Sequence, residues 1–193
     1  MLRPVLPTNS PTYRRFKKMI HIVIPTFREP EHVASILADL VRQTFTEFRV
    51  YVVNSSPGDE TSALISSNKN LAVEEIEEDP SKYWSGAIVA GQRRVLDEAA
   101  PTDFALLLNC DVRLPTDFLE NQFAQTRELG RAMTCPMAVA NESGVTSGCV
   151  VRSWLLSVTR HFVMGRVDGQ PDLPAAIPVD MLAGRGLMYP VEA

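Results

Sequence analysis

The feature that most constrains the fold of this chain is a repeated order of apolar run, polar turn and amphipathic stretch. Ile20 to Ile24, Phe48 to Val53 and Phe104 to Leu108 are short, mainly apolar runs, and each leads into a polar turn. Each run is too short to cross a membrane and has the length of a strand that is buried on both faces. Strands that alternate with helices form parallel sheets with right-handed crossovers, so their polar turns gather at one edge. The sequence therefore predicts an α/β fold with a twisted, mostly parallel central sheet flanked by helices.

The stretches between these runs show the apolar periodicity of helices. Val33, Ile36, Leu37, Leu40 and Val41 form one apolar stripe, which predicts a helix packed on the core. A later helix is expected to open at 115–117, with Phe118, Leu119, Phe123 and Leu129 on its apolar side and Gly130 as its cap. The other predicted elements are a helix at 60–66, a strand at 71–76, a helix that ends near Ala99, and strands at 133–139 and 179–182. Residues 145–163 fit either a strand followed by a helix or a long hairpin, and residues 165–178 read as a substrate-facing loop.

Length and composition favour one domain. At 193 residues the chain can bury a sizeable core, and 45% hydrophobic with 22% charged residues is ordinary for a soluble protein. Residues 1–18 contain three prolines and no periodicity, which indicates a mobile arm ahead of a domain at 19–193.

Charge and cysteine content restrict the partners and the compartment. The net charge of −4 argues against broad nucleic-acid binding. Arg14, Arg15, Lys17 and Lys18 form a small basic cluster that is either solvated or in contact with a membrane surface. The three cysteines show no C-x-x-C spacing, which argues against a disulfide framework or a zinc site. We therefore expect a cytoplasmic protein, with a peripheral position at the inner face of the membrane as the alternative.

Asp111 is the candidate metal ligand. The apolar run at 104–108 ends in Asn109-Cys110-Asp111, which places a carboxylate at the edge where open α/β sheets bind their ligands. A carboxylate oxygen suits Mg²⁺ or Mn²⁺. The alternative is that Asp111 only begins the turn before Pro115.

Several motifs, in this order, resemble the N-terminal part of the catalytic domain of an inverting family 2 glycosyltransferase with the GT-A fold. Ile22 to Phe27 reads I-V-I-P-T-F, and Gln43 to Phe45 reads Q-T-F, as at the first strand and the following helix of that family. Asn109-Cys110-Asp111 resembles the metal-binding D-x-D motif with asparagine at its first position. That replacement and the Y-W-S-G-A segment at 83–87 resemble the rhamnosyltransferase-like branch. Gly184-Arg185-Gly186 resembles the family's G-x-G segment near the acceptor and the sugar.

The resemblance implies a function as well as a fold. It implies transfer of a sugar from a UDP- or dTDP-linked donor to a saccharide or lipid-linked acceptor, with inversion, in cell-surface polysaccharide biosynthesis. It implies Asp111 as a ligand of Mg²⁺ or Mn²⁺, and Gly184, Arg185 and Gly186 on the acceptor and sugar side. The implied donor site consists of Pro25, Thr26, Phe27, Asn54, Ser56, Trp84, Gly86 and Asn109. In the resembling family the second strand ends in acidic residues that contact the base and ribose. This chain departs from the family there, because its second strand ends in Asn54.

The general base is expected outside this sequence. In the resembling family it follows the G-x-G segment, so we expect it beyond Ala193, in a C-terminal segment that this domain lacks. Asp180 is a weak substitute, since its strand-like surroundings indicate a structural or acceptor-side group.

Three classes of function remain open at this point. A glycosyltransferase domain is favoured; a nucleotide-sugar binding module without turnover is the alternative, supported by the missing base and by Asn54 and Asn109. A sugar nucleotidyltransferase is less favoured, because the loop from Pro25 to Pro30 has no glycine and one basic residue.

Other chemistry-bearing side chains have plain structural alternatives. Tyr83 and Trp84 either stack on a base or pack, and packing is favoured; Arg113 and Arg185 either bind substrate or face solvent. Cys110 has no histidine nearby in the sequence and is expected to be buried and inert. The histidines adjoin no carboxylate or cysteine at metal spacing and are read as structural: His21, His32 and His161.

Overall fold

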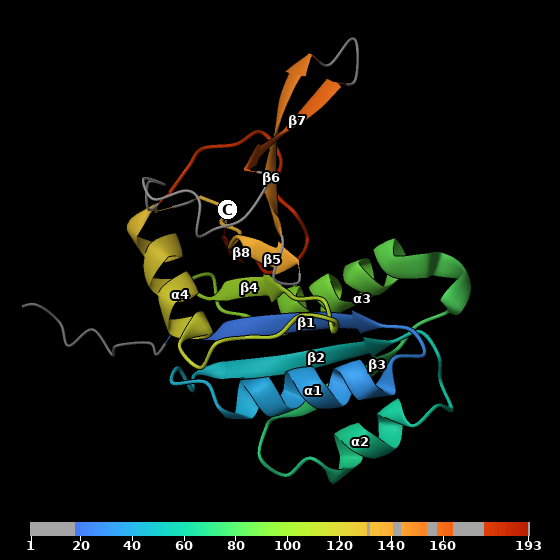
Figure 1. Ribbon diagram of the computed structural model, residues 1–193. Helices are drawn as coiled ribbons and strands as arrows, with labels where there is room; N and C mark the ends of the chain where they lie inside the picture. The colour runs from blue at the N-terminus through green and yellow to red at the C-terminus, as the bar shows by residue number, and fades with distance from the viewer. Residues whose placement is uncertain (1–17, 131, 141–143, 154–157, 164–175, 193) are drawn as a thin grey trace, which may run out of the picture.

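The computed structural model has a five-stranded sheet with helices on both faces (Figure 1). It describes residues 18–130, 132–140, 144–153, 158–163 and 176–192. The sheet has the order β3-β2-β1-β4-β8. Its strands are β1 (Ile20–Thr26), β2 (Phe48–Asn54), β3 (Val73–Glu77), β4 (Phe104–Leu107) and β8 (Leu187–Pro190). The helices are α1 (Pro30–Val41), α2 (Thr61–Ser67), the 3-10 turn η1 (Pro80–Lys82), α3 (Tyr83–Glu98) and α4 (Phe118–Glu128).

The first four strands are parallel, and this confirms the fold predicted from the sequence. β1 pairs in parallel with both β2 and β4, and β2 pairs in parallel with β3. β8 is antiparallel to β4 at the edge of the sheet. The carboxyl ends of β1, β2 and β4 therefore lie along one edge, where the polar turns were expected to meet.

The core lies on both faces of the sheet, which explains the continuous apolar runs. On one face, Ile22 and Leu106 pack with α1 and α4. On the other face, Val23 and Leu107 pack with α3. At Gly91 the helix approaches β1 so closely that a Cβ atom would lie 2.3 Å from Val23 Cγ1. A larger residue at Gly91 would push α3 away from the sheet.

His21 has the structural role that the sequence analysis gave it. Its ring is buried, with Nδ1 3.1 Å from Tyr51 Oη and Nε2 3.3 Å from Asp103 Oδ2. Asp103 also accepts a hydrogen bond from the Ala100 N–H. These contacts satisfy polar groups inside the sheet and leave His21 with no access to a ligand.

A second sheet follows α4. It has the order β5-β6-β7, and its strands are β5 (Ala138–Ala140), β6 (Gly144–Ser153) and β7 (Val158–Val163). β6 and β7 are antiparallel, so the hairpin is the correct alternative for residues 145–163. The predicted loop at 165–178 and the predicted arm at 1–18 lie almost entirely outside the described residues.

Two predicted strands are wrong. The strand at 133–139 is reduced to a single bridge from Thr134 to Met188 and the start of β5, because Pro136 has no N–H to pair. The strand predicted at 179–182 does not form, since Leu187–Pro190 occupies the place beside β4. The Y-W-S-G-A motif at 83–87 forms the start of α3.

Two residues of the predicted apolar stripes are exposed. Val41 ends α1 and is 43% exposed, and Leu129 follows α4 and is 49% exposed. Both lie at a helix end, where the sheet no longer covers the stripe.

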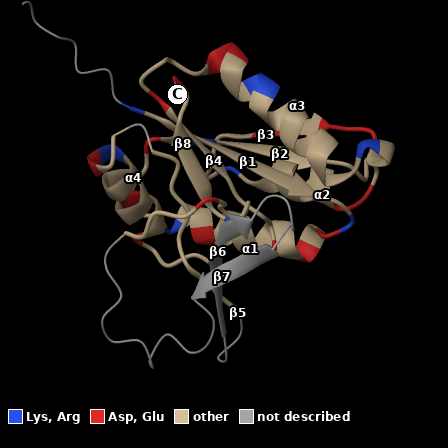
Figure 2. Cartoon of the chain, turned by 90° about the horizontal axis from the view of Figure 1, so that it is seen from above, with Lys and Arg blue, Asp and Glu red and all other residues tan. Residues whose placement is uncertain are grey.

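Acidic and basic residues are interspersed over the helices and loops (Figure 2). Within the described ranges, every helix is too short or too polar to span a membrane.

Candidate functional site

A pocket of about 320 Å³ lies at the carboxyl end of β1, beside the start of α3. The register places Thr26 opposite Asn54, so this edge also carries the end of β2. The pocket is lined by Pro25, Thr26, Phe27, Glu29, Ser55, Pro80, Tyr83, Trp84 and Ala87. Four residues of the predicted donor site therefore come together here: Pro25, Thr26, Phe27 and Trp84.

Three exposed aromatic rings border this pocket. Phe27 is 48%, Tyr83 79% and Trp84 50% exposed. Asp79 accepts a hydrogen bond from the Ser81 N–H and so begins η1, and Tyr83 then takes a left-handed backbone with φ of 53°. This sharp entry into α3 presents both rings at the pocket. Because every nucleobase has a flat π face, such rings suit a base or a sugar.

The Gly184-Arg185-Gly186 segment lies against the same aromatic group. A Cβ atom on Gly184 would be 3.1 Å from a ring carbon of Trp84, so the indole packs on this backbone. Gly186 has a φ of 98°, and its N–H donates to Leu107 O at 2.9 Å. Arg185 is exposed. The predicted acceptor-side segment and the predicted donor-side Trp84 are thus neighbours, although they are 100 residues apart in the sequence.

Asn54 and Ser56 lie beside the pocket and do not line it. Asn54 is fully buried; its Nδ2 donates to Glu75 Oε1 at 2.9 Å, and its Oδ1 accepts from the Ser56 N–H at 2.9 Å. Asp59 Oδ2 lies 2.7 Å from Ser56 Oγ. Burial opposes ionisation of Asp59, but hydrogen bonds from Ser56 and Thr61 outweigh it and lower the pKa of this carboxyl. Asn54 therefore organises the turn after β2, and Ser55 is the residue of that turn that reaches the pocket.

Asn109, Cys110 and Asp111 leave β4 at the same edge of the sheet. Asp111 is exposed, and it makes no hydrogen bond or ion pair with the part of the chain that the structure describes. Asn109 Oδ1 is buried and has no hydrogen-bond partner among the described residues. Neither residue lines the pocket, and Gly86 does not line it either. The loop that resembles D-x-D thus carries one exposed carboxylate, at Asp111, and one buried oxygen without a partner in the described residues, at Asn109.

Asp39 holds the second half of this loop. Its carboxylate is 1% exposed and accepts from Arg113 Nε at 2.7 Å, Arg113 Nη2 at 2.8 Å and the Leu114 N–H at 3.1 Å. Arg42 also pairs with it. Burial opposes ionisation of Asp39, but these hydrogen bonds and charges outweigh it and lower the pKa of the carboxyl. Arg113 therefore anchors the loop to α1, while 65% of its side chain is exposed, in line with the solvent-facing alternative.

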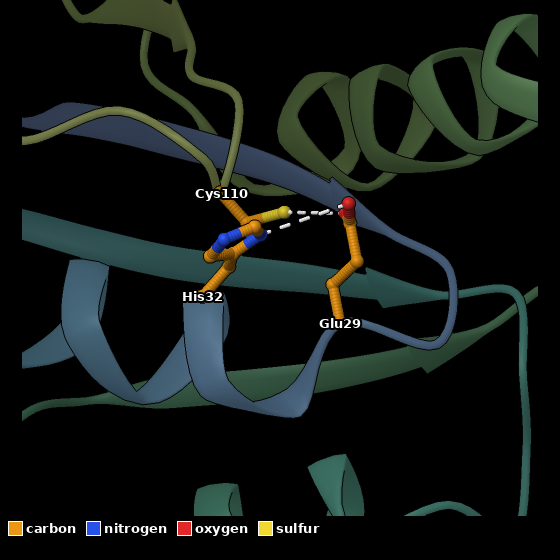
Figure 3. Close-up of side chains that lie close together, drawn as sticks. All are labelled: Glu29, His32 and Cys110. Carbon is orange, nitrogen blue, oxygen red and sulfur yellow. Dashed lines mark hydrogen bonds and ion pairs between the residues drawn. The ribbon is translucent and has the colours of Figure 1, made fainter.

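Glu29, just before α1, makes a second polar contact with the loop after β4 (Figure 3). The Cys110 thiol donates to Glu29 Oε2 at 3.0 Å, and Glu29 Oε1 lies 3.7 Å from His32 Nδ1. Burial raises the pKa of the thiol to about 12, with a further contribution from the Glu29 carboxylate. The expectation that His32 and Cys110 have no ligand-type neighbours is wrong, because the fold brings them together across 78 positions of sequence.

Sequence reasoning left five residues of the pocket out of the predicted donor site: Glu29, Ser55, Pro80, Tyr83 and Ala87. Glu29 falls between two prolines in the first loop, and its position two residues after P-T-F was the signal available. Asp180 is exposed and lies outside the pocket lining.

Comparison with known proteins agrees with this architecture. The family "Glycosyl transferase family 2" matches residues 21–168. A search of curated proteins found no match.

Solved structures share the fold at low sequence identity. A mannosyltransferase from Pyrobaculum calidifontis, in complex with GDP-Man and Mn²⁺, is 18% identical over 62% of this chain and 35% of that chain, with a TM-score of 0.50. A 4-diphosphocytidyl-2C-methyl-D-erythritol synthase is 14% identical over 91% of this chain and 76% of that chain, with a TM-score of 0.51. S. aureus TarS 1-349 in complex with UDP-GlcNAc is 20% identical over 66% of this chain and 39% of that chain, with a TM-score of 0.49.

The chain spans about a third of the length of the mannosyltransferase that it matches. The family match covers well over half of the chain, and it includes the β1 edge, the aromatic pocket and the loop after β4. With its mostly parallel sheet, the chain belongs to glycosyl transferase family 2.

Proposed function

We propose that this chain binds a nucleoside-diphosphate sugar and takes part in transfer of the sugar to an acceptor hydroxyl with inversion. The observation that carries this proposal is the aromatic pocket at the carboxyl edge of the parallel sheet. Open α/β sheets bind their ligands at this edge, and the exposed rings of Phe27, Tyr83 and Trp84 offer a stacking surface for a base. Membership of glycosyl transferase family 2 supports the reaction class.

The loop after β4 fits a divalent metal. Asp111 offers an exposed carboxylate, and Asn109 Oδ1 is a buried oxygen without a partner in the described ranges. Hard oxygen ligands of this kind suit Mg²⁺ or Mn²⁺. When bound, such an ion stabilises the negative charge that develops on the departing diphosphate. Asp111 would hold the ion, and the Asp39 contact to Arg113 and Leu114 keeps the loop in place for it.

The acceptor side is assigned to Gly184, Arg185 and Gly186. Gly184 supports Trp84, and exposed Arg185 stands next to it with a side chain suited to an anionic or polar acceptor group. A hydroxyl that attacks the anomeric carbon needs a general base within hydrogen-bond reach. Among the described residues, exposed Asp180 is the weak candidate for this base.

Calorimetric titration tests the donor site. UDP, dTDP and GDP should be titrated with and without Mn²⁺ against the wild-type chain and against Asp111→Ala. GDP belongs in the set because the mannosyltransferase with this fold is in complex with GDP-Man. We expect binding of one nucleotide that Mn²⁺ strengthens about tenfold or more in the wild type and not in Asp111→Ala, because one lost charge-assisted contact of about 1.4 kcal/mol corresponds to that factor. Absence of nucleotide binding in both proteins would contradict the proposal.

Two alternatives share the fold. A binding module without turnover would show the same titration and no transfer of sugar to an acceptor; asparagine at positions 54 and 109 favours it. A sugar nucleotidyltransferase is suggested by the likeness to 4-diphosphocytidyl-2C-methyl-D-erythritol synthase, which covers 91% of this chain. It would bind a nucleoside triphosphate and a sugar phosphate, and the glycine-free loop between β1 and α1 counts against it.

We also propose that the chain belongs to the rhamnosyltransferase-like branch, with a UDP- or dTDP-linked hexose as donor. The N-C-D and Y-W-S-G-A segments support this assignment. A cytoplasmic location, with Arg14, Arg15, Lys17 and Lys18 at the membrane surface, is consistent with a saccharide or lipid-linked acceptor. Sedimentation with anionic vesicles, for the wild type and for a variant with these four residues changed to glutamine, tests that location.

A further inference from the structure

Three different metal-binding side chains meet beside the proposed donor pocket. One ligand atom each from Glu29, His32 and Cys110 lies within 4.8 Å of the other two (Figure 3). In a tetrahedral zinc site, bond lengths of about 2.0–2.3 Å place neighbouring ligand atoms about 3.5 Å apart. Cys110 Sγ lies 3.0 Å from Glu29 Oε2, and His32 Nδ1 lies 3.7 Å from the other oxygen, Glu29 Oε1. The spacing of the three side chains is therefore close to that of a coordination shell.

The Glu29 carboxylate points into this cluster and does not cap the first turn of α1. Glu29 is the N-cap residue of α1, where a side-chain acceptor usually bonds the first helical N–H groups. It makes no such bond, and its two oxygens face Cys110 and His32. Arg28, just before it, has a left-handed backbone with φ of 57°, which is uncommon outside glycine. The chain therefore enters α1 in a way that turns Glu29 toward the loop after β4.

A buried polar group completes the surroundings. The hydroxyl of Thr26 lies beside the Cys110 thiol. Thr26 is 4% exposed, and its oxygen has no hydrogen-bond partner among the described residues. The hydrogen bond from Cys110 to Glu29 therefore leaves a buried hydroxyl beside the cluster unsatisfied.

We propose that Glu29, His32 and Cys110 form a zinc site that is distinct from the oxygen site at Asp111. Sulfur, imidazole nitrogen and carboxylate oxygen together select Zn²⁺ over Mg²⁺ or Mn²⁺. On binding, the thiol proton leaves to solvent and the thiolate becomes a ligand; three protein ligands leave one position for water or for a group of the substrate. The earlier expectation against a zinc site considered cysteine spacing alone, and this site takes its ligands from two distant segments.

The site would be coupled to the donor pocket through Glu29, because Glu29 lines both. A bound ion would fix this carboxylate at the wall of the pocket and would tie α1 to the loop that carries Asp111. The proposal goes beyond the proposed function and does not require it.

Cobalt substitution tests the site with a readout that is independent of activity. The reduced wild-type chain is titrated with Co²⁺, and the near-ultraviolet thiolate-to-cobalt absorption is followed before and after addition of Zn²⁺. We expect a band that saturates at one equivalent and disappears when Zn²⁺ displaces the cobalt. Cys110→Ser should show no band. His32→Ala and Glu29→Gln should bind Co²⁺ about 100-fold more weakly, since changes to residues that merely support a ligand already cost about 10–100-fold. His32 is exposed, so its loss should leave the fold intact and keep the test valid even if Cys110→Ser is unstable.

Matched controls separate this site from the others. Cys135→Ser, which removes a free cysteine outside the cluster, and Asp111→Ala should both keep the band, and excess Mg²⁺ should not weaken it. A wild-type chain without the band would overturn the proposal, as would a band that survives in Cys110→Ser. A band lost in Asp111→Ala would also overturn it, because the ion would then sit at the proposed donor-metal site. Nucleotide titration of the same preparations reports separately on the proposed function.

Discussion

The aromatic pocket and the Asp39 contact use their side chains in opposite ways. The rings of Phe27, Tyr83 and Trp84 are about half exposed or more, although apolar groups gain free energy when they are buried. Asp39, near the end of α1, is 1% exposed, although a carboxylate loses free energy when it leaves water. A buried charge thus holds the loop after β4, and exposed rings at the pocket face a ligand. Changes to Asp39 should affect stability, and changes to the rings should affect binding.

The largest effect is expected for Asp39→Asn. The amide removes the negative charge that pairs with Arg113 and Arg42 and brings N–H groups against those donors. We expect a loss of about 2–3 kcal/mol in the free energy of unfolding, as for other broken buried charge networks. Urea denaturation followed by circular dichroism measures it, with Glu31→Gln on the exposed side of α1 as the matched control. Equal midpoints for Asp39→Asn and the wild type would show that the loop does not depend on this contact.

The pH dependence of the free energy of unfolding should also report the Asp39 contact. The pKa of Asp39 is lowered in the folded chain, because the Arg113 and Leu114 hydrogen bonds outweigh the opposing effect of burial. A group with a lowered folded pKa stabilises the fold above its unfolded pKa of about 3.9, and this stabilisation is lost as the pH falls through the folded pKa. Unfolding free energies measured from neutral to strongly acidic pH should therefore fall less steeply below about pH 4 in Asp39→Asn than in the wild type. Parallel curves for the two proteins would exclude Asp39 as a contributor to acid sensitivity.

Trp84→Ala should weaken nucleotide binding and have little effect on the stability of the fold. The indole borders the pocket and packs on Gly184, and its exposed half limits what the fold loses with it. We expect nucleotide affinity to fall about tenfold, within the range of about 1–3 kcal/mol for a base stacked on an aromatic ring. Calorimetry measures the affinity and thermal unfolding the stability; Leu96→Ala, an exposed position on the same helix, is the control. A large loss of stability with unchanged affinity would make Trp84 a packing residue, the alternative that the sequence favoured.

The smallest effect is expected for Leu129→Ser. Periodicity placed Leu129 on the apolar side of α4, but the side chain is 49% exposed. Its replacement should change the free energy of unfolding by no more than about 0.5 kcal/mol, as for ordinary surface positions. Leu119→Ala, at a fully buried position of the same helix, provides the contrast in the same denaturation experiment. A loss comparable with that of Leu119→Ala would indicate that Leu129 is covered in solution.

The parallel half of the fold was predictable because its information is local. β1, β2 and β4 are short apolar runs that alternate with helices, so strand direction and the ligand edge follow from alternation. The C-terminal part was less predictable because its pairing is remote. β8 joins β4 across some 80 residues, and Pro136 breaks a segment that otherwise reads as a strand.

The candidate site divides in the same way. Pro25, Thr26, Phe27 and Trp84 were predicted from motifs and line one pocket. Asn54 was predicted as a ligand-binding residue; it is buried and hydrogen-bonded to Ser56, Asp59 and Glu75, of which Glu75 is remote in the sequence. Whether these residues contact a donor stays a prediction until nucleotide binding is measured.

By itself, the sequence determined the α/β class, the parallel order of strands and the edge where ligands bind, because these depend on the spacing of apolar and polar residues along short stretches. Only the tertiary structure decided which distant side chains meet. Arg113 pairs with Asp39, Gly184 supports Trp84, and Cys110 joins Glu29 and His32. Each of these contacts joins segments about 75 to 100 residues apart, and their geometry is set by how the helices pack on the sheet.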